Sequence, residues 1–121
     1  MKINIKATNF ELTDAIRDYA TKKIESLESK YLEGDESVMC DIEVGKISEH
    51  HKQGDVFRAE VNIHYAHGEA YASVEKDNLY AAIDEVKDEV AKTIRRKKDR
   101  RHTLIRKGGA TIKKIIKGFR W

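Results

Sequence analysis

Residues 56–101 read VFRAEVNIHYAHGEAYASVEKDNLYAAIDEVKDEVAKTIRRKKDRR, and this stretch decides the fold. Its first part alternates apolar and polar residues, which is typical of two half-buried strands separated by a turn at His67 and Gly68. After Asp77 or Asn78, either of which can cap a helix, apolar residues recur every three or four positions. The stretch therefore predicts two strands followed by a long amphipathic helix.

The residues before position 56 predict a strand, a helix and a second strand. Residues 2–8 alternate, and Thr13 is a good N-cap for a helix that runs to about Tyr31 with one apolar stripe. Residues 38–44 alternate again, and the polar segment 48–55 is typical of a hairpin loop. The full order is thus β-α-β-β-β-α.

This order predicts an α+β fold. Both helices are amphipathic on one side only, so the economical arrangement is a four-stranded, mainly antiparallel sheet with both helices packed on one face. The other face of the sheet is expected to be solvated and acidic, because it would carry Asp41, Glu43, Glu60 and Glu75. Such a surface suits RNA poorly, so a nucleic-acid site is expected on the helices.

Charge is divided unevenly along the 121 residues. Residues 1–94 contain 12 Lys and Arg against 20 Asp and Glu, whereas residues 95–121 contain 12 Lys and Arg and a single acid, Asp99. An acidic body with a strongly basic arm is the pattern expected for binding a phosphate polymer or an anionic surface. The alternative interpretation is an arm that only improves solubility.

The predicted second helix changes character at residue 95. Continuing its apolar stripe beyond Ile94 places Lys97 and Arg101 where buried residues would stand, and charged side chains are not buried unpaired at reasonable cost. We therefore expect the helix to run past the core, although basic residues also complement the dipole at a helix C-terminus. The candidate RNA-binding residues on this helix are Lys92, Arg95, Arg96, Lys97, Lys98, Arg100 and Arg101.

The first helix adds a possible basic ridge. On a helical wheel Lys22 and Lys30 lie along one flank of its apolar stripe, and Lys23 lies near the boundary. An ordinary charged helix surface would account for them equally well.

The chain is expected to divide into a domain at 1–102 and a basic tail at 103–121. Beyond a probable helix stop at Gly108 and Gly109, apolar residues recur with helical spacing, so the tail can form a short cationic amphipathic helix. This helix could bind RNA, a partner protein or an anionic membrane, or it could pack against the domain itself. The tail cations expected to make contacts are Arg106, Lys107, Lys113, Lys114, Lys117 and Arg120.

Catalytic, metal and cofactor signatures are absent from the sequence. The five histidines follow no ligand spacing, and the single cysteine, Cys40, falls at an inward strand position where a buried, inert thiol is expected. One cysteine excludes an internal disulfide, and no apolar run reaches the roughly 18–20 residues of a membrane span. We expect a non-enzymatic protein with no cofactor and no signal peptide, in a reducing compartment.

Several short motifs, taken in order, resemble a known family. They are Ile3-Asn4-Ile5, Ala15-Ile16-Arg17, Ala72-Ser73-Val74-Glu75 and, most specifically, Asn78-Leu79-Tyr80-Ala81-Ala82-Ile83-Asp84 leading into the basic run. Over about residues 2–100 the chain resembles the short form of the ribosome hibernation-promoting factors, also called ribosome-associated translation inhibitors. That resemblance implies the fold predicted above, similar in outline to double-stranded RNA-binding domains.

The resemblance also implies a function. Such a protein is expected to be cytoplasmic and ribosome-associated, and to bind the small ribosomal subunit across the A and P sites and the mRNA path. There it would exclude mRNA and tRNA and inhibit translation during stress or dormancy, with helix cations on ribosomal RNA phosphates. We expect a monomer when free and no membrane partner. By position Lys23, Lys92, Arg95, Arg96 and Lys98 match the family's basic pattern, whereas Glu89 stands where the family usually has Lys.

A second hypothesis comes from the residues alone. The basic arm could dock on an anionic membrane surface or an acidic protein, with RNA binding incidental. Co-sedimentation with vesicles and with ribosomes at matched ionic strength separates the two.

Overall fold

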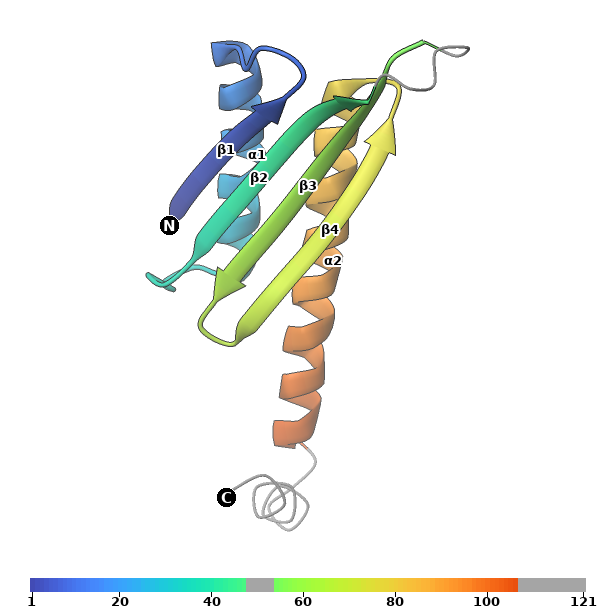
Figure 1. Ribbon diagram of the computed structural model, residues 1–121. Helices are drawn as coiled ribbons and strands as arrows, with labels where there is room; N and C mark the ends of the chain where they lie inside the picture. The colour runs from blue at the N-terminus through green and yellow to red at the C-terminus, as the bar shows by residue number, and fades with distance from the viewer. Residues whose placement is uncertain (48–53, 107–121) are drawn as a thin grey trace.

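A computed structural model describes the chain at residues 1–47 and 54–106, with side chains as far as Arg101. It contains the six predicted elements in the predicted order (Figure 1). They are β1 (Lys2–Thr8), α1 (Asp14–Tyr31), β2 (Met39–Ile47), β3 (Val56–Tyr65), β4 (Gly68–Lys76) and α2 (Leu79–Arg106). The predicted hairpin loop lies mostly outside the described residues, and so does the tail beyond Arg106.

The four strands form one sheet in the order β1-β2-β3-β4. β1 pairs with β2 in parallel, because α1 intervenes and returns the chain to the same end of the sheet. β2 pairs with β3 and β3 with β4 antiparallel, so the sheet is mainly antiparallel as predicted. The register aligns Ile5 with Ile42, Ile42 with Val61 and Val61 with Ala72, which places apolar side chains in rows on one face.

Local signals fix where both helices begin. The Thr13 hydroxyl accepts a hydrogen bond of 3.2 Å from the Ile16 amide, so Thr13 is the N-cap of α1. Between the two predicted caps of α2, the structure selects Asn78, whose side-chain oxygen accepts a hydrogen bond of 3.0 Å from the Ala81 amide. Each cap satisfies an amide that the first helical turn leaves without a partner.

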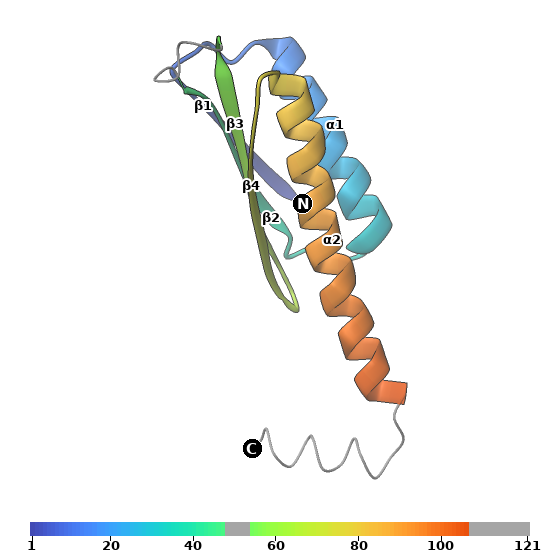
Figure 2. The same cartoon turned by 90° about the vertical axis from the view of Figure 1, so that its right-hand side faces the viewer.

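Both helices cover the same face of the sheet, as Figure 2 shows edge-on. They run in the same direction, and the core lies between them and the inward residues of the strands. Ala20, Ile24 and Leu27 of α1 are buried there, together with six positions of α2, namely Leu79, Ala82, Ile83, Val86, Val90 and Ile94. The prediction of two helices on one sheet face is therefore confirmed.

The lower part of α2 passes beyond the end of the sheet (Figures 1 and 2). Ile94 is only 2% exposed, yet none of residues 95–101 is buried. The helix continues unbroken to Arg106, so the predicted division between residues 102 and 103 falls inside α2. We call residues 95–101 the α2 extension.

Candidate nucleic-acid interface

The α2 extension is a cationic helix segment on the outside of the core. Arg95, Arg96 and Arg100 are exposed, and the only acid in the segment is Asp99. The segment contains no residue that breaks a helix. Its cations lie toward the C-terminal, negative end of the helix dipole, where positive charge stabilises a helix. The segment therefore stays helical without an apolar face to bury.

The cations of the extension are not neutralised by carboxylates of the domain. Among the side chains that the structure describes, the ion pairs join other residues, such as Lys46 with Asp55 and Lys76 with Glu85. No described carboxylate lies within ion-pair distance of the Lys or Arg residues at 95–101. Their charge is available to an external anion.

One cation of the extension has a structural contact. The ammonium of Lys97 donates a hydrogen bond of 2.6 Å to the backbone carbonyl oxygen of Glu69, near the start of β4. This contact ties the extension to the β3–β4 turn. It also leaves the charge of Lys97 uncompensated, because a carbonyl oxygen carries no net charge.

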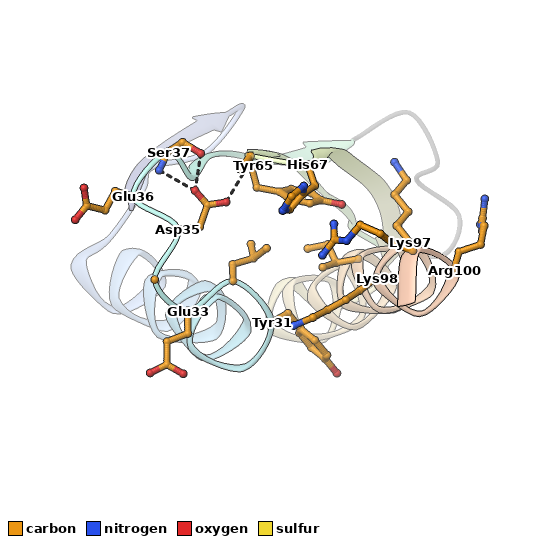
Figure 3. Close-up of a pocket in the computed structure, with 15 residues that line it drawn as sticks. Tyr31, Glu33, Asp35, Glu36, Ser37, Tyr65, His67, Lys97, Lys98 and Arg100 are labelled. Carbon is orange, nitrogen blue, oxygen red and sulfur yellow. Dashed lines mark hydrogen bonds between the residues drawn. The ribbon is translucent and has the colours of Figure 1, made fainter. Parts of the chain in front are cut away.

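Lys98 and Arg101 are half-buried, whereas the other cations of the extension are exposed. Together with Lys97 and Arg100 they line a cavity below the end of the sheet. Figure 3 shows Lys98 reaching from α2 toward Tyr31 at the end of α1. The extension thus has an outward cationic face and a second cationic edge that borders this cavity.

The cations of α1 fall into two groups. Lys22 and Lys30 are exposed, and the Lys30 ammonium lies 5.5 Å from the centre of the Tyr31 ring. Lys23 instead forms an ion pair of 3.1 Å with Asp84 of α2 and lies 5.2 Å from the centre of the Tyr19 ring. Part of its charge is therefore compensated within the protein.

Asp84 receives two donors, because the Tyr19 hydroxyl also donates to it at 2.6 Å. Partial burial alone would raise the pKa of Asp84, but hydrogen bonds from Tyr19 and Lys23 outweigh it and lower the pKa. The same hydrogen bond and charge raise the pKa of Lys23. All three groups keep their ordinary protonation at neutral pH, and the pair cross-links the two helices.

Lys92 also has an acidic neighbour. Its ammonium lies 3.4 Å from Glu89, one turn earlier on α2. Both side chains are about half exposed, so the pair is weak and an RNA phosphate could displace it.

The outer face of the sheet has the opposite character, as predicted. Asp41, Glu43 and Glu75 are exposed on it, and Glu60 is half-buried. Asn4 and Thr8 donate hydrogen bonds of 3.1 and 3.0 Å to Asp41 and Glu43. The α2 extension is thus rich in cations, whereas the outer sheet face carries these carboxylates beside Lys2, Lys6 and Arg58.

Comparison with known proteins assigns the chain to a family. Residues 3–102 match the family described as Sigma 54 modulation protein / S30EA ribosomal protein. The chain belongs to this family.

Relatives and solved structures agree with this assignment. A "Ribosome hibernation promoting factor" of Klebsiella oxytoca is 33% identical over 100 residues, which cover 83% of this chain and 96% of that protein. Its namesake in Escherichia coli K12 is 31% identical over the same shares. The N-terminal domain of Thermus thermophilus Protein Y matches with a TM-score of 0.67 and 31% identity over 79% of this chain and 98% of that one.

A more distant structure supports the fold alone. A ribosomal subunit interface protein from Coxiella burnetii has a TM-score of 0.66 at 14% identity, covering 82% of this chain and 99% of that chain. The family resemblance drawn from the sequence motifs is thus confirmed.

The described residues also bear on thiol reactivity, metal binding and membrane insertion. Cys40 is fully buried as predicted, and burial followed by the charge of Asp41 raises the pKa of its thiol to about 12. Within residues 1–47 and 54–101, no three His, Cys, Asp or Glu side chains gather closely enough to hold a metal ion. In the described part of the chain, no helix is both long and apolar enough to cross a membrane.

The structure brings together most, but not all, of the predicted site. Eight candidates on α2 and at the end of α1 lie around the lower half of the helix layer, namely Lys30, Lys92, Arg95, Arg96, Lys97, Lys98, Arg100 and Arg101. Lys22 and Lys23 lie higher on α1. The side chains of Arg106, Lys107, Lys113, Lys114, Lys117 and Arg120 lie outside the described residues.

Sequence reasoning missed two features of this site. Neither the bond from Lys97 to Glu69 nor the cavity beside Tyr31, Tyr65 and His67 was expected. The cavity arises where three separated segments meet, and a one-dimensional pattern carries no signal for it.

Proposed function

We propose that this protein is a ribosome hibernation factor that binds the small ribosomal subunit at the A and P sites and in the mRNA channel. Bound there, it excludes mRNA and tRNA and inhibits translation during stress or dormancy. Its relatives named ribosome hibernation promoting factor support the role. The observation that carries the proposal is the α2 extension, whose cations have no described carboxylate partner.

The driving force is the release of counterions from ribosomal RNA. Each Lys or Arg that neutralises a phosphate frees condensed cations, so a cluster of such residues binds RNA with strong dependence on salt. The folded domain supplies shape, and no catalytic step is required. The action is that of a plug rather than an enzyme.

The helix side is the proposed contact surface. Arg95, Arg96 and Arg100 supply the outward charges, and Lys22, Lys30 and Lys92 extend them along the helix layer. The outer sheet face is turned away, because its carboxylates would repel phosphates. This sidedness supports the proposed orientation, with the helix side toward RNA.

The tail cations from Arg106 to Arg120 are proposed to follow RNA beside the mRNA channel. A chain that ends after Lys107 is expected to occupy ribosomes less completely and to inhibit translation less. If occupancy and inhibition were unchanged, the tail would have no part in the mechanism.

The decisive experiment compares two double variants that remove the same charge from opposite surfaces. Arg95→Gln with Arg96→Gln is expected to abolish co-sedimentation with small subunits at about 150 mM salt, because two phosphate contacts are lost. Lys2→Gln with Lys6→Gln, two exposed positions of the outer sheet face, is the matched control and is expected to sediment normally. Circular dichroism checks that both variants are folded.

Two further measurements separate this proposal from its alternative. The protein is expected to compete with mRNA and with initiator tRNA for the small subunit. After centrifugation with vesicles of anionic lipid, it is expected to remain in the supernatant. Equal loss of ribosome binding in both double variants would refute the helix surface. Binding to vesicles but not to ribosomes would instead favour a membrane-docking module.

A further inference from the structure

The cavity below the end of the sheet has no role in the phosphate contacts described so far. It has a volume of about 1000 Å³ and opens between the segment that follows α1, the β3–β4 turn and the α2 extension (Figure 3). This volume is at the upper end of the range of roughly 300–1,000 Å³ for small-molecule sites. We call it the end cavity.

The inner surface of the end cavity is apolar and aromatic. Leu32 and Ile94 are nearly buried there, at 7% and 2% exposed, and so they form part of a fixed floor. Tyr65 lines the same space and is half-buried, so its ring keeps some surface for a ligand. Tyr31 lines the edge of the cavity, and its ring points away from it (Figure 3). A flat, unsaturated ring is the chemistry that such surfaces favour.

The cationic wall of the cavity comes from α2. Lys97, Lys98, Arg100 and Arg101 line it, Lys98 and Arg101 being the half-buried two, and none of the four pairs with a described carboxylate. Arg101 lies close enough to Tyr65 to lower the pKa of its hydroxyl, although burial has the larger, opposite effect. Cation and aromatic ring thus face the same space.

The opposite wall is acidic but already engaged. Asp35 accepts hydrogen bonds from the Ser37 amide at 2.9 Å, from the Ser37 hydroxyl and from the Ala66 amide at 2.9 Å. Figure 3 shows Glu33 and Glu36 pointing away from the cavity. The carboxylate of Asp35 repels a phosphate from this wall, so an anionic group must lie on the side of Lys98 and Arg101.

We propose that the end cavity binds one nucleoside monophosphate unit, with its base against the Tyr65 ring and its phosphate on the cations of α2, foremost Arg101. A bare phosphate would leave the Tyr65 ring unused, and an apolar ligand would leave the cations of α2 without a partner. The bases of a duplex are paired and stacked on one another, whereas an unpaired nucleotide presents a free base for stacking. The unit can come from a free nucleotide or from an unpaired position in RNA, and only the RNA source rests on the proposed function.

Titration calorimetry with the full chain tests this site in two arms. One arm uses AMP, GMP, CMP and UMP, and the other uses a single-stranded RNA pentamer and its duplex. Saturable binding in either arm supports the proposal and identifies the source. Tyr65→Leu and Arg101→Gln are each expected to weaken it by about tenfold or more, because the first removes the ring on which the base stacks and the second removes a charge that contacts the phosphate.

Two control variants remove the same kinds of side chain, a tyrosine and an arginine, at positions outside the end cavity. Tyr71→Leu removes an exposed ring on the outer sheet face, and Arg17→Gln removes an exposed charge from the first turn of α1, at the other end of the helix layer. Both are expected to change binding less than about twofold. Equal weakening by Arg17→Gln would overturn the site, because net charge alone would then explain binding. Should Tyr65→Leu unfold, Arg101→Gln still gives the answer.

Further outcomes also decide against the proposal. No saturable binding in either arm, equal affinity for ribose 5-phosphate and AMP, or equal affinity for duplex and single strand would each overturn it. Ribosome co-sedimentation of the same variants keeps the two proposals apart. If the end-cavity variants bind ribosomes normally and no nucleotide binds, the cavity fails while the hibernation role stands.

Discussion

The ammonium of Lys97 donates a 2.6 Å hydrogen bond to the backbone carbonyl oxygen of Glu69, and so joins the α2 extension to the first residues of β4. Beyond Ile94 the helix has no buried side chain as far as Arg101. The bond from Lys97 is the one described side-chain hydrogen bond between this segment and the sheet. We infer that Lys97 positions the neighbouring cations as well as adding to their charge.

Lys97→Met is expected to loosen the extension. A hydrogen bond from a charged donor contributes about 1.5–3 kcal/mol, and exposure to water reduces this value here. Amide hydrogen exchange at residues 98–101 should accelerate several-fold, because the helix end frays more often. Arg95→Met, which removes a charge but no described hydrogen bond, is the control. Similar exchange in both variants would mean that Lys97 contributes charge alone.

Binding to small subunits should weaken steeply as salt rises. For about six to ten phosphate contacts, affinity falls by roughly 10³- to 10⁵-fold between about 50 and 200 mM salt. The double variant Arg95→Gln with Arg96→Gln should lower the slope of log affinity against log salt by roughly 1.4 to 1.8. Fluorescence anisotropy over a salt series measures both slopes.

The control for this series is Lys2→Gln with Lys6→Gln, whose slope should equal that of the unaltered protein because these residues lie on the outer sheet face. A slope that is the same for all three proteins would mean that Arg95 and Arg96 touch no phosphate.

The fold could be predicted because its elements are specified locally. Alternation and helical spacing identify every strand and helix, and single side chains such as Thr13 and Asn78 start the two helices. One-sided amphipathicity then forces both helices onto one face of the sheet. The exact register, in contrast, depends on contacts between strands and follows from no local pattern.

The site could be predicted only as a set of charges. The sequence identifies the α2 extension, because six cations follow an abruptly ended apolar stripe. It does not reveal that Lys23 pairs with Asp84 or that Lys97 contacts Glu69, since long side chains choose partners that the fold brings near. The sequence therefore shows which cations are present, whereas the contacts of each side chain are known only from the structure.

Asp84→Asn is expected to raise affinity for ribosomes and lower stability. Removing the carboxylate frees Lys23 for a phosphate, so affinity should rise a few-fold at low salt and the salt slope should steepen by roughly 0.7 to 0.9. The Tyr19 hydroxyl loses a charged acceptor, which should lower the free energy of unfolding by about 1 kcal/mol.

Glu25→Gln is the matched control for Asp84→Asn, because it removes an exposed acid of α1 that has no described ion pair. It should leave stability unchanged. If Asp84→Asn leaves affinity unchanged or lowers it, Lys23 is a structural residue and not an RNA contact.

Acid should destabilise the protein partly through Asp35. Hydrogen bonds from the Ser37 hydroxyl and from the amides of Ala66 and Ser37 lower the pKa of Asp35 below its ordinary value. An Asp whose pKa is lower in the folded than in the unfolded protein stabilises the folded state at pH values above the unfolded pKa, which is about 3.9. This stabilisation is lost as the pH falls through the pKa of the folded protein. Urea unfolding should therefore show falling stability below about pH 4.

Asp35→Asn should flatten this dependence, because its side chain no longer titrates. Glu36→Gln removes a neighbouring carboxylate that accepts no described hydrogen bond, and should leave the acid slope close to that of the unaltered protein. Identical slopes for Asp35→Asn and the unaltered protein would rule out a contribution from this carboxylate.

The Cys40 thiol should report on global unfolding. Burial raises its pKa to about 12, so at pH 8 only about one thiol in ten thousand is ionised, and the sulfur is also fully shielded from reagents. Ellman's reagent should therefore react slowly with the native protein and at the rate of a free thiol in concentrated urea. Because Cys40 lies on β2, in the middle of the core, its labelling rate at low urea should follow the unfolding free energy obtained from circular dichroism. Fast labelling without urea would show that β2 opens separately, and the sheet could not then serve as the rigid support from which α2 projects.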